Sequence, residues 1–291
     1  MKNAVFGWCS APRRKYPWGV AFLLLGVYSD ADAQNESDPN LANPWAIVDV
    51  PRDGYSIAGL VNHQTGNGSY KQGIALFPGH PGILRLREEG GQAAFALKGN
   101  FLIRSRRHWL DAETLIVVVD APSDQWASFS QDFRTTPRYG EDVAALLHGV
   151  SARYGVKEWT AVGTSEGSIS AFHAARMNPP LFQRLILTAS VFSRSRNGPG
   201  LSDVRWTDLS MPLLWVHHVD DPCLYTTYRS AEDHAALTKA PLITVRGGEG
   251  ARGKSCEAYT AHGFVGVEAP TVAAMKGWVK TGKTASFDRV D

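Results

Sequence analysis

The stretch Thr160-Ala-Val-Gly-Thr-Ser-Glu-Gly167 places Ser165 between two glycines, directly after a short apolar run. Residues 159–162 suit a short buried strand, and Glu166–Met177 is rich in helix formers until two prolines stop it. A serine on a tight turn between a strand and a helix needs glycine on either side, because a Cβ there would clash with the neighbouring backbone. The pattern predicts an exposed, nucleophilic Ser165, and the alternative is an ordinary loop serine.

An acid and a histidine follow the serine along the chain, each in a loop beside a predicted regular element. The apolar run 211–216 predicts a strand that opens into a loop carrying Asp220 and Asp221. His262 precedes the predicted helix 265–280. A serine hydroxyl is a poor nucleophile at neutral pH, so an imidazole must take its proton and an acid must orient that imidazole. His262 is therefore the candidate base, and one of the two aspartates is its candidate partner.

The order serine, aspartate, histidine resembles that of the α/β-hydrolase superfamily, over about residues 55–280 of this chain. In that family the acid ends a pattern of the type Val-His-Gly-x-x-Asp, which aligns with 216–221 and selects Asp221 over Asp220. This chain departs from the pattern at His218, where the family has glycine. The resemblance implies an α/β-hydrolase fold, in which helices cover both faces of a mostly parallel central sheet as a three-layer sandwich. It also implies a catalytic triad of Ser165, Asp221 and His262.

The resemblance further implies two backbone N–H groups that would bind the oxyanion of a tetrahedral intermediate. One is the amide of Glu166, directly after the serine. The other would come from Pro78-Gly-His-Pro-Gly82, which follows the predicted strand 73–77 and resembles the family's oxyanion loop. Proline has no N–H, so the amides of the two glycines and of His80 remain, and that of His80 is the best placed. The His80 side chain either lines the pocket or is a solvated loop histidine.

Residues 1–33 have the features of a secretory signal peptide. Arg13-Arg-Lys15 precedes an apolar core at 20–27, and Ala31-Asp-Ala33 offers a small-residue cleavage site. The core is shorter than the roughly 20 residues that a membrane-spanning helix needs, so we expect a secreted or periplasmic protein without a stable membrane anchor. Without this leader the numbers of basic and acidic residues are equal, and nothing in the charge indicates a nucleic-acid partner.

Removal of the leader would also remove Cys9 and leave Cys223 and Cys256. In an oxidising compartment this even count favours one disulfide, and two unpaired thiols are the alternative. Cys223 lies two residues after Asp221, and Cys256 lies six residues before His262. The bond would therefore tie the acid loop to the histidine loop and hold the geometry of the two side chains.

The sequence predicts a single domain over 34–291, in which strands and helices alternate along the second half. Such alternation favours a mostly parallel sheet that is covered on both faces and binds ligands at the C-terminal ends of its strands. The predicted strands lie at 45–50, 55–61, 73–77, 102–106, 114–120, 159–162, 185–188, 213–217 and 242–245.

No cofactor is implied, since the sequence contains no phosphate loop and no flavin or nicotinamide fingerprint. His217 and His218 beside two aspartates could suggest a metal site. Neighbouring side chains at the end of a strand point in opposite directions, however, so we expect no shared ion. His173 falls inside the predicted helix after the serine, where packing or solvent exposure explains it.

The predicted function is that of a secreted serine hydrolase that cleaves carboxylic esters, small or polymeric, through an acyl-enzyme. Many members of the superfamily carry an inserted helical lid, whereas Ser190–Asp208 is here a Gly/Ser/Arg-rich loop, so we expect an open or lightly covered site. Trp126, Phe129 and Phe133 either wall the substrate pocket or pack in the core. The alternatives to an esterase are an amidase or peptidase with the same triad, or a non-catalytic binding module on the same fold.

Overall fold

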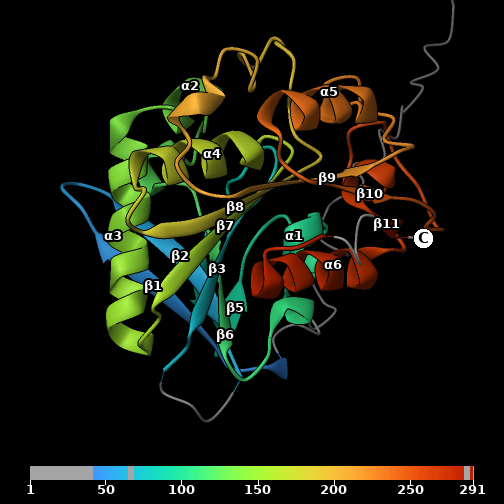
Figure 1. Cartoon of the computed structure of the whole chain (residues 1–291). Coiled ribbons are helices and arrows are strands. Elements are labelled where there is room, and N and C mark those ends of the chain that lie inside the picture. The colour runs from blue at the N-terminus through green and yellow to red at the C-terminus, as the bar shows by residue number, and fades with distance from the viewer. Residues whose placement is uncertain (1–41, 65–68, 285–288, 291) are drawn as a thin grey trace, which may run out of the picture. The chain divides into compact units, whose positions relative to one another are not determined.

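A nine-stranded sheet crosses the part of the chain that the structure, a computed structural model, describes: residues 42–64, 69–284 and 289–290 (Figure 1). The predicted signal peptide and its cleavage site lie outside these residues. The strands are β1 (Trp45–Pro51), β2 (Ser56–Asn62), β3 (Gln72–Phe77), β6 (Thr114–Val119), β7 (Glu158–Thr164), β8 (Phe182–Thr188), β9 (Leu213–His218), β10 (Leu242–Val245) and β11 (Arg289–Val290).

The sheet is mostly parallel, with strand order β1-β2-β6-β3-β7-β8-β9-β10-β11. β1 pairs antiparallel with β2, and β2 pairs antiparallel with β6, while every other neighbouring pair is parallel. β1 and β2 thus form an antiparallel edge on an otherwise parallel sheet. The C-terminal ends of β3, β7, β8 and β9 consequently lie at the same edge, where loop residues from distant parts of the chain meet.

Six helices occur in the described part of the chain. They are α1 (Phe101–Arg104), α2 (Gln131–Arg134), α3 (Pro137–Tyr154), α4 (Gly167–Met177), α5 (Tyr228–Thr238) and α6 (Glu268–Thr281). The longest, α3, has local signals at both ends. The Thr136 hydroxyl accepts a hydrogen bond from the Tyr139 amide, Pro137 occupies the first turn, and Gly155 ends the helix with φ 65°.

The central strands bury both of their faces. In β3, Ala75 and Phe77 belong to one apolar layer, while Ile74 and Leu76 belong to the other. Because successive side chains of a strand point to opposite faces, such strands appear in the sequence as continuous apolar runs. Helices α3, α4 and α5 complete the first layer, and α1 and α6 complete the second (Figure 1). The predicted mostly parallel sheet with helices on both faces is confirmed.

One predicted strand is wrong. Residues 102–106 were expected to be extended, but Phe101–Arg104 forms α1 and Arg106–Trp109 forms a 3₁₀ turn. The Asn100 side chain accepts a hydrogen bond from the Leu102 amide and so caps the helix at its start. A short apolar run has no periodicity that distinguishes a strand from a buried helical turn. The other predicted strands coincide with β1, β2, β3 and β6 to β10, and a small hairpin of β4 (Arg87–Glu89) and β5 (Gln92–Ala94) was not predicted.

All described residues belong to one compact unit that spans 38–291. Among them, no helix combines the length and the apolar character that crossing a membrane requires.

Candidate active site

Ser165 lies on the turn between β7 and α4 and has a left-handed backbone, with φ 52°. A residue other than glycine rarely adopts this conformation, and its surroundings must hold it there. A Cβ added to Gly163 would lie 2.3 Å from the carbonyl oxygen of Gly167, and one added to Gly167 would lie 2.0 Å from that of Phe77. The two glycines of the sequence pattern are thus required by close backbone approach.

The loop after β3 lies directly against this turn. A Cβ on Gly79 would come within 2.9 Å of the Ser165 Cβ, so the loop approaches the serine only because glycine stands there. Within the described residues, neither the His80 amide nor the Glu166 amide donates a hydrogen bond. Both predicted oxyanion donors are therefore free of acceptors in the described part of the chain.

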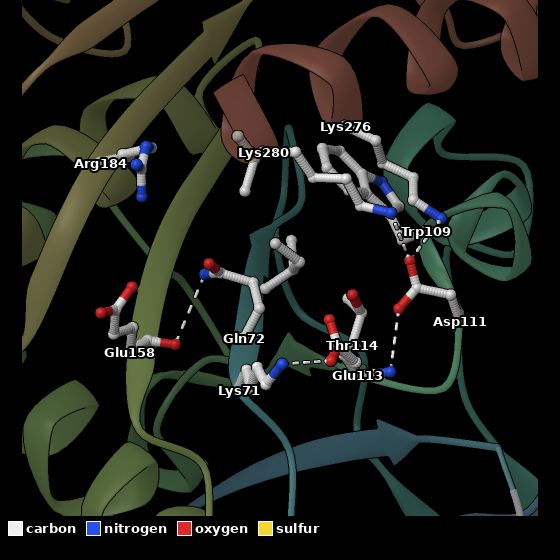
Figure 2. Close-up of a pocket in the computed structure, with 12 residues that line it drawn as sticks. Lys71, Gln72, Trp109, Asp111, Glu113, Thr114, Glu158, Arg184, Lys276 and Lys280 are labelled. Atoms are coloured by element: carbon white, nitrogen blue, oxygen red, sulfur yellow. Dashed lines mark hydrogen bonds and ion pairs between the residues drawn. The ribbon is translucent and has the colours of Figure 1, made fainter. Parts of the chain in front are cut away.

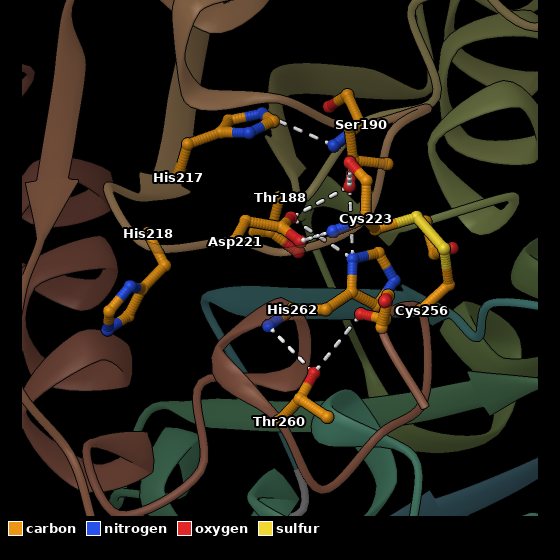
Figure 3. Close-up of polar contacts among 12 residues, drawn as sticks. Thr188, Ser190, His217, His218, Asp221, Cys223, Cys256, Thr260 and His262 are labelled. Carbon is orange, nitrogen blue, oxygen red and sulfur yellow. Dashed lines mark hydrogen bonds and ion pairs between the residues drawn. A yellow bond between two sulfur atoms is a disulfide. The ribbon is translucent and has the colours of Figure 1, made fainter. Parts of the chain in front are cut away.

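Asp221 and His262 form a buried pair (Figure 3). The side chains are 1% and 5% exposed, and His262 Nδ1 lies 3.1 Å from Asp221 Oδ2. The Thr226 hydroxyl donates to the same Asp221 oxygen at 2.7 Å and lies 3.1 Å from His262 Nδ1. The other Asp221 oxygen accepts from the Cys223 amide at 2.9 Å. With the carboxylate on Nδ1, the proton of a neutral imidazole resides there and Nε2 keeps its lone pair.

Asp220, the alternative acid, has a different environment. Its side chain is exposed, and its amide donates to His218 Nδ1 at 3.0 Å. Of the two neighbouring aspartates, Asp221 is the one that contacts His262. The structure thus brings together the pair that the family pattern selects.

Cys223 and Cys256 form a disulfide, as predicted (Figure 3). Cys223 is buried and Cys256 exposed, and both line the same pocket as Ser165. The bond joins the loop of Asp221 to the segment that leads into the histidine loop. A Cβ on Gly263, next to the histidine, would lie 1.9 Å from the Ala258 carbonyl oxygen, so that loop is also held by close packing.

His217, His218 and His173 are buried and do not belong to the proposed triad. His217 Nε2 accepts from the Ser190 amide at 3.2 Å, while His218 Nε2 donates to the Gly247 carbonyl at 2.8 Å, so the two rings point to opposite sides of β9 (Figure 3). Burial lowers the pKa of His217 to about 3 and that of His173 in α4 to about 4, so both rings are neutral. No three His, Cys, Asp or Glu side chains in the described residues are clustered as metal ligands would be.

Glu166 has a role that the sequence did not reveal. One carboxylate oxygen accepts from the side-chain amides of Gln131 and Asn197, each at 3.1 Å, and the other accepts from His80 Nδ1 at 3.0 Å. Burial alone would raise the pKa of Glu166, but the His80 hydrogen bond and the nearby Arg134 guanidinium outweigh it and hold the pKa at about 2. The bond to Glu166 in turn raises the pKa of His80. This carboxylate, on the residue next to Ser165, therefore connects the start of α2 and two separate loops to the serine turn.

Ser165 opens into a pocket of about 360 Å³. Its wall includes the polar side chains of His80, Gln131, Ser195, Arg196, Asn197 and Tyr225. The 190s loop thus reaches the pocket without a helical insertion, apart from a 3₁₀ turn at Trp206–Asp208. Trp126, Phe129 and Phe133 do not line it; they pack with the core layer of α3 and α4, so packing is the correct alternative for these aromatics.

A second pocket, of about 240 Å³, lies at the opposite ends of β3 and β7 (Figure 2). Its side chains pair with one another: Asp111 lies 3.1 Å from Lys280 Nζ and 3.4 Å from Lys276 Nζ, and Lys71 pairs with Glu113. None of the residues predicted to take part in catalysis is found there.

Three solved structures share the architecture of this chain. Est1E from Butyrivibrio proteoclasticus has a TM-score of 0.54 at 13% identity, over 81% of this chain and 99% of that one. The 2,6-dihydroxy-pseudo-oxynicotine hydrolase has a TM-score of 0.54 at 16% identity, over 86% and 71%. A predicted CIB-like hydrolase from Thermoplasma acidophilum has a TM-score of 0.51 at 13% identity, over 81% and 99%. No protein-family model and no curated protein sequence matches the chain. At these identities the likeness establishes the fold.

Proposed function

We propose that this chain, which has the α/β-hydrolase fold, is a serine hydrolase that cleaves carboxylic esters through an acyl-enzyme. The observation that carries the proposal is the strained backbone of Ser165 at the C-terminal edge of the sheet. The buried Asp221–His262 pair lies at the same edge. Nucleophile, imidazole and carboxylate at one edge supply the groups that acyl transfer to water requires. Two of the solved neighbours are named hydrolases, which supports the same class.

In the first half of the reaction, the Ser165 hydroxyl oxygen attacks the ester carbonyl carbon. His262 Nε2 takes the hydroxyl proton, and Asp221 stabilises the resulting imidazolium through Nδ1. The tetrahedral intermediate collapses when the bond to the leaving oxygen breaks, and that oxygen takes the proton back from His262. The alcohol leaves, and the acyl group stays on Ser165.

The negative charge of each tetrahedral intermediate falls on the former carbonyl oxygen. The amides of Glu166 and His80 are its proposed donors, since both lie beside the serine without an acceptor in the described chain. Removing one such donor typically costs about 3 to 4 kcal/mol of transition-state stabilisation. Glu166 supports this arrangement through its side chain, because its bond to His80 ties the β3 loop to the serine turn.

In the second half, a water molecule replaces the alcohol. His262 takes a proton from the water as it attacks the acyl carbon, and then returns the proton to the Ser165 oxygen as the carboxylic acid leaves. An ester is the proposed substrate in preference to an amide, because an alkoxide leaves with less help from a general acid than an amine does. Matched ester and amide substrates with the same acyl group test this preference through their kcat/KM values.

A fluorophosphonate probe tests the proposed nucleophile. The probe should label the native protein on Ser165, and neither the Ser165→Ala variant nor heat-denatured protein should react. Ser128→Ala, which removes an exposed serine outside the pocket, is the matched control and should label like the wild type. A native protein that stays unlabelled, or a Ser165→Ala variant that labels equally well, would contradict the proposed mechanism. The first result would favour a non-catalytic binding module on the same fold.

Export is part of the proposal. The Cys223–Cys256 disulfide supports an oxidising compartment, where such bonds persist. We propose that residues 1–33 are removed and that the mature enzyme is the single domain 34–291, secreted or periplasmic. N-terminal sequencing of the exported protein should begin at Gln34, and an intact N-terminus on the exported protein would contradict cleavage.

A further inference from the structure

A tight hairpin turn, Ser195–Gly198, lies at the mouth of the Ser165 pocket. The Ser195 amide donates to the Gly198 carbonyl at 2.8 Å, and the Gly198 amide donates to the Ser195 carbonyl at 3.2 Å. The Asn197 amide also donates to the Ser195 hydroxyl at 3.0 Å. The two residues at the tip, Arg196 and Asn197, therefore have a defined backbone although they lie in an irregular loop.

The turn is also fastened to the serine turn. The Asn197 side chain donates to Glu166 at 3.1 Å. Gly198 has φ 144°, which other residues rarely adopt, and a Cβ there would lie 2.6 Å from the Gln131 side-chain oxygen. Gln131 itself donates to Glu166. The hydrogen-bonded side chains of Asn197, Gln131 and Glu166 thus hold the backbone beside Arg196 against the pocket.

Two arginines of this loop differ in their partners. Arg194 forms an ion pair with Asp203 at 2.6 Å and does not line the pocket. Arg196 lines the pocket, is exposed, and has no carboxylate partner among the described residues. A guanidinium is charged at every physiological pH and presents a planar fork of donors that fits a carboxylate.

In the described part of the chain, the carboxylates of the pocket and of the triad are already bonded to other groups than Arg196. Glu166 is the only acidic residue in the described pocket wall, and its oxygens are occupied by Gln131, Asn197 and His80, with Arg134 at 3.7 Å. Asp221 is bonded to His262, Thr226 and the Cys223 amide. Among the described residues, Arg196 therefore gives the pocket a cation that no carboxylate of the chain pairs with.

We infer that the ester substrate carries a carboxylate, which Arg196 binds at the mouth of the Ser165 pocket. The inference rests on the proposed hydrolase function and narrows its substrate to esters with an anionic group, such as monoesters of dicarboxylic acids. The polar side chains in the pocket wall agree with a charged acyl group. Arg196 then determines specificity, while the triad does the chemistry.

Two para-nitrophenyl esters of equal acyl length test the inference, the monoester of glutaric acid and the ester of pentanoic acid. We expect the wild type to prefer the anionic ester by about 10- to 100-fold in kcat/KM, the size expected of one charge-assisted contact. Arg196→Gln should remove this preference through a higher KM and leave the neutral ester within about twofold. Arg194→Gln is the matched control and should change neither ester.

Two further measurements sharpen the result. Arg196→Lys keeps the charge without the fork and should retain part of the preference, and rising salt should weaken the wild-type preference because the contact is exposed. Equal turnover of the two esters by the wild type, or equal losses on both in Arg196→Gln, would overturn the inference while the hydrolase proposal stands. Failure of the wild type on both esters together with absent fluorophosphonate labelling would instead overturn the hydrolase proposal, and the inference with it.

Discussion

The pockets at the two ends of β3 and β7 both contain charged groups but differ in how the chain holds the groups around them. At the N-terminal ends, Asp111 and its two lysines form partly exposed ion pairs on an unstrained backbone (Figure 2). At the C-terminal ends, Ser165 is strained and the Asp221–His262 pair is almost fully buried. Exposed pairs contribute little energy, whereas breaking a buried pair leaves an uncompensated charge. Strain and burial, more than cavity volume or charge, therefore distinguish the candidate active site.

The largest expected effect is on the buried pair. Asp221→Asn should lower kcat for para-nitrophenyl acetate by about 10⁴-fold, because an amide in place of the carboxylate no longer fixes the tautomer of His262 or stabilises its cation. Asp220→Asn is the matched control, since its side chain is exposed and lies next in sequence. It should stay within about twofold of the wild type. The opposite ranking of the two variants would show that the acid is Asp220.

A steric substitution beside the serine should have the next largest effect. Gly167→Ala places a Cβ 2.0 Å from the Phe77 carbonyl oxygen, so the backbone of α4 or of the β3 loop must move. We expect a loss of about 4 kcal/mol or more in the free energy of unfolding, measured with urea. Gly149→Ala in α3 is the control, because its Cβ would meet only Val50, at 3.4 Å. That variant should gain up to about 1 kcal/mol, and similar urea midpoints for the two would refute the steric argument.

Removal of the disulfide is expected to cost less. The bond closes a loop with a sequence separation of 33 residues, and Cys223→Ala with Cys256→Ala should lower the unfolding free energy by about 3 to 4 kcal/mol in the chain-entropy model. Ester turnover should also fall, because the bond joins the Asp221 loop to the segment before His262. The wild-type domain 34–291, unfolded without reductant, should contain no titratable thiol. Free thiols in that sample would show that the bond does not form.

The sequence predicted those parts of the site that have local signals. Gly163 and Gly167 mark the serine turn because their constraint is steric and lies within five residues. For the later loops, the signal was the order of Ser165, Asp221 and His262 along the chain. The even count of cysteines predicted the disulfide between these loops. Local signals failed at residues 102–106, where an apolar run suits a strand or a helical turn, and where the Asn100 side chain caps a helix in the structure.

Contacts between distant segments were beyond local reasoning. Glu166 was predicted only through its amide, and its carboxylate network depends on Gln131, Asn197 and His80 being brought together by the fold. The sequence likewise did not single out Thr226, because its contact with His262 joins segments that are 36 residues apart. Both residues are polar and buried, and each contacts partners in distant segments that no spacing in the chain encodes.

The smallest expected effect concerns the N-terminal pocket and tests the comparison from its other side. Partial burial would raise the pKa of Asp111, but hydrogen bonds from Thr114 and Lys280 outweigh it and bring the pKa from 3.8 down to about 2. A carboxyl whose pKa is lowered on folding adds stability above the unfolded value, and loses it as the pH falls through the folded value. Asp111→Asn should therefore cost about 1 kcal/mol or less at neutral pH, since the pairs are partly exposed, and the difference from wild type should vanish between about pH 4 and pH 2.

Ester turnover by Asp111→Asn should equal that of the wild type, because the altered ion pairs lie at the opposite ends of the strands from Ser165. Urea unfolding across this pH range and kcat/KM at neutral pH measure the two effects separately. Lys276→Met removes the other member of one pair and should give the same small stability loss with unchanged turnover. A large fall in turnover for both variants, with stability intact, would mean that the second pocket takes part in the reaction and that strain and burial are the wrong criteria.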